Sequence, residues 1–224
     1  MATLAKRGLL VSIDGPGGAG KSALAEAAAK LLRRSGHLVL NTAEPSTGAV
    51  GDLIRTGTHY RGLTLACLVA ADRLDHLTTE IQPALDSGVT VICDRYTPSS
   101  HVLQTLDHVP AEYVAHLNTY APAPDLAVIL TCDPAEITRR LREQETPGRF
   151  GDDVRRPARE VAAFADLAER LTGPTLVLDS TSTPAKSLAN RVFWAVRTLA
   201  SGGAHLPPSP GADSHPTDTP SPFT

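Results

Sequence analysis

The sequence lacks the features of a membrane-spanning, secreted or nucleic-acid-binding protein. None of its apolar runs approaches the roughly 20 residues that a transmembrane helix needs. Its start has neither the apolar core nor the small-residue cleavage site of a signal peptide. A formal net charge of -3 argues against nucleic acid or an anionic membrane surface as the main partner. We therefore expect a cytoplasmic protein that binds a small anionic molecule in a cleft.

Cysteine is scarce as well. Cys67, Cys93 and Cys132 are far apart, have no Cys-x-x-Cys spacing and each lie in an apolar stretch. This pattern predicts buried core thiols in a reducing compartment. The six histidines before residue 200 also lack metal-ligand spacing, and we assign them to the surface or to packing; they are His37, His59, His76, His101, His108 and His116.

Short apolar runs alternate with helical patterns along the chain. Near-continuous apolar runs of this length are typical of strands buried on both faces of a parallel sheet. The runs are 8–13, 37–42, 89–93, 125–131 and 175–178, and the helical patterns are 21–35, 64–87, 110–119, 134–143, 157–171 and 184–199. This alternation predicts an α/β fold with a five-stranded parallel sheet and helices on both faces.

The predicted domain covers residues 1–200. Asp133 is expected to cap the helix that begins at Pro134, and Thr97 and Thr183 stand in the same place before a proline. From residue 201 to 224 the chain is rich in Pro, Ser, Gly and Thr and has almost nothing apolar to bury. We expect this tail to be disordered.

A glycine-rich segment, Gly15-Pro-Gly-Gly-Ala-Gly-Lys-Ser22, fits the phosphate-loop pattern G-x-x-x-x-G-K-[ST]. It follows a predicted strand and opens a predicted helix, as a phosphate loop requires. Glycine lets backbone N–H groups approach phosphates without a Cβ in the way, and the helix N-terminus favours an anion. The predicted ATP-binding residues are Gly15, Gly17, Gly18, Ala19, Gly20, Lys21 and Ser22, with Lys21 on the β and γ phosphates and Ser22 on Mg²⁺.

The segment Asp94-Arg95-Tyr96 ends the predicted third strand. Ligands of doubly wound sheets bind at the carboxyl ends of the strands, so we expect Asp94 beside the phosphate loop, holding Mg²⁺ through water. Arg95 points into the same cleft, and Arg73 on the helix at 64–87 lies close by. The guanine-reading pattern N-K-x-D is absent from the sequence, which disfavours a GTPase.

These and further motifs together resemble the thymidylate kinases, nucleoside monophosphate kinases that convert dTMP to dTDP. The resemblance runs over most of residues 8–199. It includes Glu44-Pro45, Ala-Ala-Asp72-Arg73, Asp94-Arg95-Tyr96-Thr-Pro-Ser99-Ser100 with Gln104, and Gly148-Arg149-Phe150. It implies a P-loop NTPase fold, a mobile lid at about 143–156 and, commonly in the family, a homodimer packed through helices.

The resemblance also implies roles for single residues. Asp94 would organise the metal, Arg95 would bind the acceptor phosphate, and Arg149 would close over the transferring phosphoryl group. The predicted catalytic residues are Lys21, Asp94, Arg95 and Arg149, and the cofactors are ATP and Mg²⁺. The predicted acceptor site contains Glu44, Pro45, Val69, Arg73, Arg95, Ser99, Ser100, Leu103 and Gln104. The Glu44–Pro45 bond is expected to be cis.

Four positions depart from the family, all in the acceptor half. Gly17 replaces an acidic residue that engages the sugar 3′-hydroxyl, and Ala43 replaces an arginine before Glu-Pro. Val69 replaces an aromatic residue that stacks on thymine, and Leu103 replaces a tyrosine. Because a base–aromatic contact contributes about 1–3 kcal/mol, these changes predict an altered acceptor pocket.

Three functions remain open from the sequence. The first is phosphorylation of a nucleoside monophosphate by ATP with an altered acceptor pocket. The second is a kinase of a modified nucleotide or a non-nucleotide metabolite on the same scaffold. The third is a non-catalytic ATP-binding regulator, which the complete set of Lys21, Ser22, Asp94 and Arg95 argues against.

Overall fold

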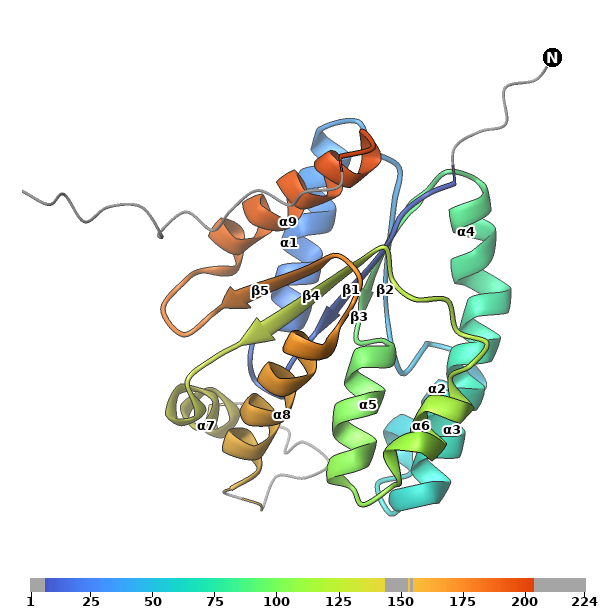
Figure 1. Ribbon diagram of the computed structural model, residues 1–224, viewed down its shortest axis with the longest axis vertical. Coiled ribbons are helices and arrows are strands. Elements are labelled where there is room, and N and C mark those ends of the chain that lie inside the picture. The colour runs from blue at the N-terminus through green and yellow to red at the C-terminus, as the bar shows by residue number, and fades with distance from the viewer. Residues whose placement is uncertain (1–6, 144–152, 154, 204–224) are drawn as a thin grey trace, which may run out of the picture.

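Five parallel strands form the centre of the computed structural model, which describes residues 7–143, 153 and 155–203 (Figure 1). The strands are β1 (Leu10–Asp14), β2 (Val39–Ala43), β3 (Thr90–Asp94), β4 (Leu126–Thr131) and β5 (Thr175–Asp179). Their order in the sheet is β2-β3-β1-β4-β5. The predicted five-stranded parallel sheet is therefore confirmed.

Helices cover both faces of this sheet. On one face, Val11 and Ile13 of β1 pack with α1 (Lys21–Arg34) and α9 (Ala185–Ala200) in the largest hydrophobic cluster. On the other face, the adjacent Leu10 packs in a cluster with Leu85 of α4 (Gln82–Asp86). Successive strand residues point to opposite faces, so burial on both faces explains the continuous apolar runs. The remaining helices on this second face include α5 (Thr97–Leu106) and α8 (Arg156–Arg170).

The helix predicted at 64–87 is divided in the structure. It consists of α3 (Gly62–His76), a π-helical turn η1 (Leu77–Ile81) and α4. Within this stretch the hydroxyls of Thr78 and Thr79 donate to the carbonyls of Leu74 and Asp75, each at 2.8 Å. Wide turns of this kind interrupt helices at functional sites more often than elsewhere. The interruption follows His76 directly.

One helix was not expected from the sequence, α2 (Ala49–Thr56). It contains Gly51, where a Cβ would stand 2.0 Å from the carbonyl oxygen of Ser46. This close approach leaves no room for a side chain at position 51. Because glycine has a low helix propensity, the sequence of this segment does not indicate a helix. The other short helices are α6 (Ala111–Leu117) and α7 (Pro134–Arg142).

Two sets of local predictions were wrong. Cys67 is exposed, because its position on α3 faces outward beside the Tyr113 hydroxyl, 3.5 Å away. Asp133 does cap α7 through the N–H groups of the first turn, but Thr97 and Thr183 do not cap their helices. Thr97 is itself the first residue of α5, and the residue before α9 is Pro184.

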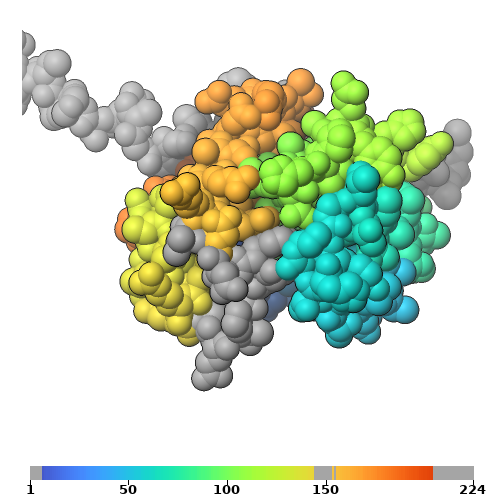
Figure 2. Space-filling model, turned by 90° about the horizontal axis from the view of Figure 1, so that it is seen from below, coloured from blue at the N-terminus to red at the C-terminus, as the bar shows by residue number. Residues whose placement is uncertain are grey.

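The parallel arrangement brings the carboxyl ends of all strands to one edge of the sheet. Figure 2 looks onto this end, where α7 in yellow, α8 in orange, α5 in green and α2 and α3 in cyan surround the centre. β1 and β3 are neighbours there, with Ile13 paired to Asp94. The phosphate loop after β1 therefore lies beside the loop after β3.

Most of the predicted lid and tail lies outside the described residues, so the domain boundaries stay a prediction. Among the helices described, none combines the length and apolarity needed to cross a bilayer.

Candidate active site

The loop from Gly15 to Ser22 has a backbone that only glycine adopts easily. Gly15, Gly18 and Gly20 have φ angles of 146°, 76° and 93°. A Cβ on Gly15 would meet the carbonyl oxygen of Leu130 at 2.3 Å, whereas a Cβ placed on Gly20 would have no heavy atom of the described residues within 4 Å, its two chain neighbours aside. The loop thus packs tightly at its start and is open at the start of α1, where an anion would bind.

Lys21 is buried at the base of this loop, with 6% of its surface exposed. Its Nζ donates a hydrogen bond to the Pro16 carbonyl oxygen at 2.6 Å. Burial, with a contribution from the positive Arg95, lowers the pKa of Lys21 to about 7. A polyphosphate bound to the loop would supply the negative charge that restores the ammonium form.

The hydroxyl of Ser22 donates to Asp94 Oδ2 at 2.5 Å, joining the phosphate loop to the end of β3. The other carboxylate oxygen, Asp94 Oδ1, is buried and has no hydrogen-bond partner among the described residues. Two oxygen ligands of this kind suit Mg²⁺, which keeps several waters and takes few protein oxygens. The residues present therefore fit a magnesium ion.

Asp14 fixes the turn that carries Arg95. Its fully buried carboxylate accepts hydrogen bonds from the Tyr96 N–H at 2.9 Å and from the Ser99 N–H and hydroxyl at 2.9 and 2.6 Å. Arg95 has a φ of 71°, a left-handed conformation that costs a residue with a Cβ about 1–2 kcal/mol. Its guanidinium reaches the Gly15 carbonyl oxygen at 3.3 Å, so the strained turn directs Arg95 onto the phosphate loop.

Sequence reasoning missed Glu160. This buried residue of α8 accepts a hydrogen bond from the Gly17 N–H at 2.9 Å and pairs with Arg156 Nε at 2.7 Å. The resemblance implies an acidic side chain at the position of Gly17, and here a carboxylate reaches the same loop from a different element. Its contact spans 143 residues of sequence, so no local pattern indicates it.

Arg73 and Glu44 form a buried ion pair at the end of β2. The Nε and NH2 groups of Arg73 donate to Glu44 Oε2 at 2.8 and 2.5 Å, and its NH1 group donates to Asn118 Oδ1. The guanidinium also lies 5.2 Å from the ring centroid of Tyr96. Only 2% of Arg73 is exposed. The pair joins α3 to the loop after β2, as expected if both residues belong to one site.

The loop after Glu44 is held from a second side. Asp72, next to Arg73 on α3, accepts from the Ser46 N–H at 2.7 Å and from the Ser46 hydroxyl at 2.6 Å. The Glu44–Pro45 peptide bond is cis, which confirms the prediction from the resemblance. Two adjacent residues of α3 therefore fix the chain that follows β2.

The other predicted acceptor residues differ in their surroundings. Ser99 uses its hydroxyl on Asp14, and Ser100 is buried beside it. Gln104 is buried with its Oε1 atom unpartnered among the described residues, so it has capacity to bind a ligand. Val69 is half-buried on α3, and Leu103 packs against the cluster that contains Phe164. Burial above all, together with the positive charge of Arg73, lowers the pKa of His101.

The predicted catalytic Arg149 lies outside the described residues. All predicted ATP-binding residues from Gly15 to Ser22, together with Asp94 and the predicted acceptor residues, lie within the described part of the chain. A phosphate loop at the first strand of a parallel sheet, a Ser–Asp pair that would fit a magnesium ion and an arginine-bearing loop after the adjacent strand are the features of a P-loop phosphotransferase.

Comparison with known proteins gives the family. The family model for thymidylate kinase matches residues 13–189. A probable thymidylate kinase of Pyrobaculum calidifontis is 37% identical over 167 residues, which are 72% of this chain and 84% of the relative. One from Thermococcus gammatolerans is 35% identical over 174 residues, with the same coverage of 72% and 84%. A thymidylate kinase of Xanthomonas campestris pv. campestris is 35% identical over 147 residues, 64% of this chain and 65% of the relative. The chain belongs to the thymidylate kinase family of nucleoside monophosphate kinases.

Proposed function

We propose that this protein transfers the γ-phosphoryl group of ATP to a nucleoside monophosphate, giving the nucleoside diphosphate. The observation that carries the proposal is the Ser22–Asp94 hydrogen bond of 2.5 Å. It joins the loop that would bind ATP to the strand end that bears Arg95, so that donor and acceptor phosphates would meet at one place.

The donor side needs little beyond positioning and positive charge. The N–H groups of the glycine loop and the Nζ of Lys21 would bind the β and γ phosphates. Ser22 directly, and Asp94 through water, would hold Mg²⁺, which neutralises charge on the phosphate oxygens when bound. Arg95 would bind the acceptor phosphate, and Arg149 of the predicted lid would add a further cation during transfer.

On the acceptor side, the buried Gln104 Oε1 has no hydrogen-bond partner among the described residues, which supports a ligand with a hydrogen-bond donor such as a base N–H group. Glu160 would supply the carboxylate that the phosphate loop lacks at Gly17 and would accept from a sugar hydroxyl. Val69 and Leu103 still stand where the family has aromatic residues, and Ala43 stands where it has an arginine. We propose that the preferred acceptor differs from dTMP, either in its base or by a modification.

The test is turnover with Mg-ATP and a panel of nucleoside monophosphates, read as ADP release and as product mass. Lys21→Met should lose about 10²–10³ in rate, whereas Lys30→Met, an exposed lysine on the same helix, should keep it. Turnover of another monophosphate in preference to dTMP supports the altered pocket, and selective turnover of dTMP contradicts it. ATP binding without turnover of any member would favour a different metabolite as the acceptor. The homodimer and the cytoplasmic location stay predictions.

A further inference from the structure

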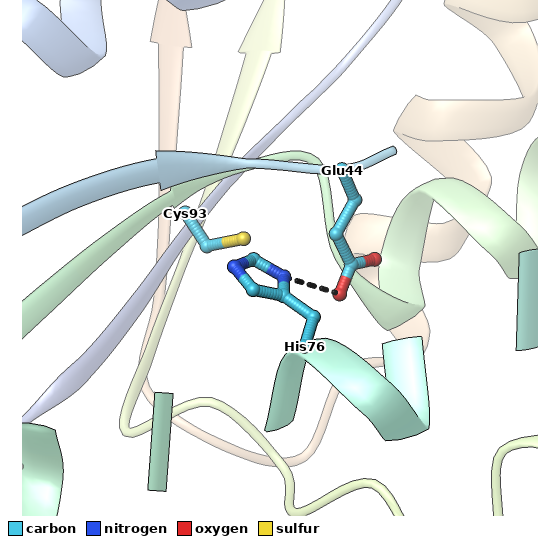
Figure 3. Close-up of side chains that lie close together, drawn as sticks. All are labelled: Glu44, His76 and Cys93. Atoms are coloured by element: carbon cyan, nitrogen blue, oxygen red, sulfur yellow. Dashed lines mark ion pairs between the residues drawn. The ribbon is translucent and has the colours of Figure 1, made fainter. Parts of the chain in front are cut away.

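A second group of ionisable side chains lies next to Arg73, on the side of its partner Glu44. Glu44 after β2, His76 at the end of α3 and Cys93 on β3 are all buried, and their ligand-type atoms lie within 4.8 Å of one another. Figure 3 shows the imidazole of His76 between the thiol of Cys93 and the carboxylate of Glu44. The group has no part in the transfer chemistry described above.

Both nitrogens of His76 face carboxylates. Its Nε2 is 2.9 Å from Glu80 Oε2 and 2.9 Å from the Thr42 hydroxyl, which itself donates to Glu80. Its Nδ1 forms an ion pair with Glu44 Oε1 at 3.8 Å (Figure 3). A neutral ring would direct a lone pair at one of the two carboxylates, whereas an imidazolium donates toward both. The geometry therefore favours the charged form.

The energetics of the ring agree with this geometry. Burial opposes a charge on His76, but the negative charges of Glu44 and Glu80, together with the hydrogen bond to Glu80, outweigh it and raise the pKa above the ordinary 6.5. The other groups facing the ring are the neutral thiol of Cys93 and, beyond Glu44, the guanidinium of Arg73. With the ring protonated, two carboxylates are balanced by two cations.

The same group does not suit a metal ion. Glu44 Oε1 and His76 Nδ1 have no hydrogen-bond partner among the described residues, but the third ligand-type atom, the Cys93 thiol, donates to the Arg95 carbonyl oxygen at 3.0 Å. Burial above all, together with the negative charge of Glu44, raises the pKa of the Cys93 thiol well above its usual range. Zinc takes thiolate ligands, so a thiol held in its neutral form is a poor partner for it.

Glu44 connects His76 to the acceptor site. One carboxylate oxygen faces His76, and the other accepts both the Nε and NH2 groups of Arg73. We propose that His76 is the positioning residue for Arg73: as an imidazolium between Glu80 and Glu44, it fixes the carboxylate that orients the acceptor-binding guanidinium. This inference rests on the proposed function and on the prediction from the sequence that Arg73 belongs to the acceptor site.

A positioning role has a distinct kinetic signature. As the pH rises from 6.5 through the raised pKa of His76, Glu44 loses one of its two cationic partners, and the orientation of Arg73 loosens. The KM for the acceptor should then rise roughly tenfold, because a less well oriented Arg73 weakens its charged hydrogen bond to the acceptor. KM for ATP itself should rise with pH as Lys21 loses its proton, but its ratio between His76→Asn and wild type, and the ratio of kcat, should stay near one at each pH.

The experiment compares the wild-type protein with His76→Asn and Glu80→Gln between pH 6 and 9. His76→Asn should show the raised acceptor KM at every pH, so that its ratio to wild type is largest at low pH. Glu80→Gln removes one carboxylate from a side chain that is 43% exposed, and should move the midpoint of the KM change to lower pH. The exposed His116→Asn on α6 is the matched control and should behave as wild type.

If His76 only stabilises the fold, the result should be different. If His76→Asn only lowers the melting temperature and its acceptor KM follows the wild-type pH profile, the inference is overturned. Stoichiometric zinc binding in equilibrium dialysis, lost in His76→Asn, would also overturn it, because the ring would then be a metal ligand.

A substrate-free measurement separates this inference from the proposed function. A wild-type protein that phosphorylates no monophosphate overturns the proposed function but leaves the NMR signal of the Arg73 Nε–H group observable. The Arg73 signal should broaden over the same pH range in which the NMR signals of the His76 ring show its deprotonation. In Glu80→Gln, the midpoint pH of the Arg73 change and that of the His76 titration should both be lower. An Arg73 signal that ignores the state of His76 overturns the inference whatever the acceptor is.

Discussion

Glu160 on α8 accepts a hydrogen bond from the backbone N–H of Gly17 at 2.9 Å, so a carboxylate lies against the phosphate loop without being part of it. A Cβ on Gly17 would stand 3.8 Å from the same carboxylate oxygen, an ordinary contact distance. A larger acidic side chain at position 17 would compete with Glu160 for this space. The small residue at position 17 therefore leaves room for Glu160, and the acidic group at the loop comes from α8, the helix that follows the predicted lid.

Replacing Glu160 tests whether this carboxylate binds the acceptor sugar. Glu160→Gln keeps the shape of the side chain and removes its charge. We expect kcat/KM for a 2′-deoxynucleoside monophosphate to fall about tenfold or more, because a hydrogen bond to a charged group contributes about 1.5–3 kcal/mol. The wild-type preference for this acceptor over its 3′-deoxy analogue should fall by the same factor. Glu169→Gln, exposed on the same helix, should leave both values unchanged. Equal loss on both acceptors would instead assign Glu160 to the phosphate loop alone.

Binding of ATP should take up a proton at alkaline pH. In the ligand-free protein the pKa of Lys21 is about 7, so this lysine is mostly neutral at pH 8. The bound phosphates favour the ammonium form, and binding at pH 8 should therefore take up about one proton. At pH 6 the lysine is already charged, and the uptake should be small. Calorimetry in buffers of different ionisation enthalpy measures this directly, and a binding heat at pH 8 that is independent of the buffer would contradict it.

Residues within contiguous motifs were predictable from the sequence, and residues joined by long-range contacts were not. The roles proposed for Lys21 and Asp94 follow from a phosphate loop after one strand and an acid at the end of another, because parallel strands share an edge. Glu160 and His76 gave no such signal. Each acts through a partner far along the chain, and a single glutamate or histidine on a helix is usually solvated or packed.

The fold shows the same division. Strands were found because burial on both faces leaves continuous apolar runs. The exposed Cys67 and the unexpected α2 depended on how neighbouring helices pack, as at Gly51 against Ser46. The acceptor site is the least predictable part. An arginine on a helix is usually a solvated surface charge, whereas Arg73 is buried and hydrogen-bonded to Glu44.

The left-handed backbone of Arg95 should make one inactive variant more stable than another. Arg95→Gly and Arg95→Ala both remove the guanidinium, so both should lose at least about 10² in kcat/KM for the acceptor. Glycine adopts the φ of 71° without a steric penalty, whereas the Cβ of alanine retains that penalty. Arg95→Gly should therefore be about 1 kcal/mol more stable than Arg95→Ala, a difference of roughly 2–4 °C in Tm for a domain of this size. Equal melting temperatures would mean that the loop relaxes out of this conformation once the arginine is gone.

Restoring an aromatic side chain at Val69 tests the proposed acceptor specificity. Val69 lies one helical turn before Arg73 on α3 and is half-buried, so a phenylalanine there would extend beside the acceptor arginine. A stacked base contributes about 1–3 kcal/mol, and Val69→Phe should raise kcat/KM for dTMP about tenfold, mainly through KM. Leu63→Phe, at an exposed position near the start of α3, controls for added apolar surface. A gain for dTMP at the expense of the preferred acceptor would identify Val69 as the residue that sets the choice of base. No gain would mean that the base binds away from α3 and that its specificity is set elsewhere, with Gln104 and Leu103 on α5 the next positions to change.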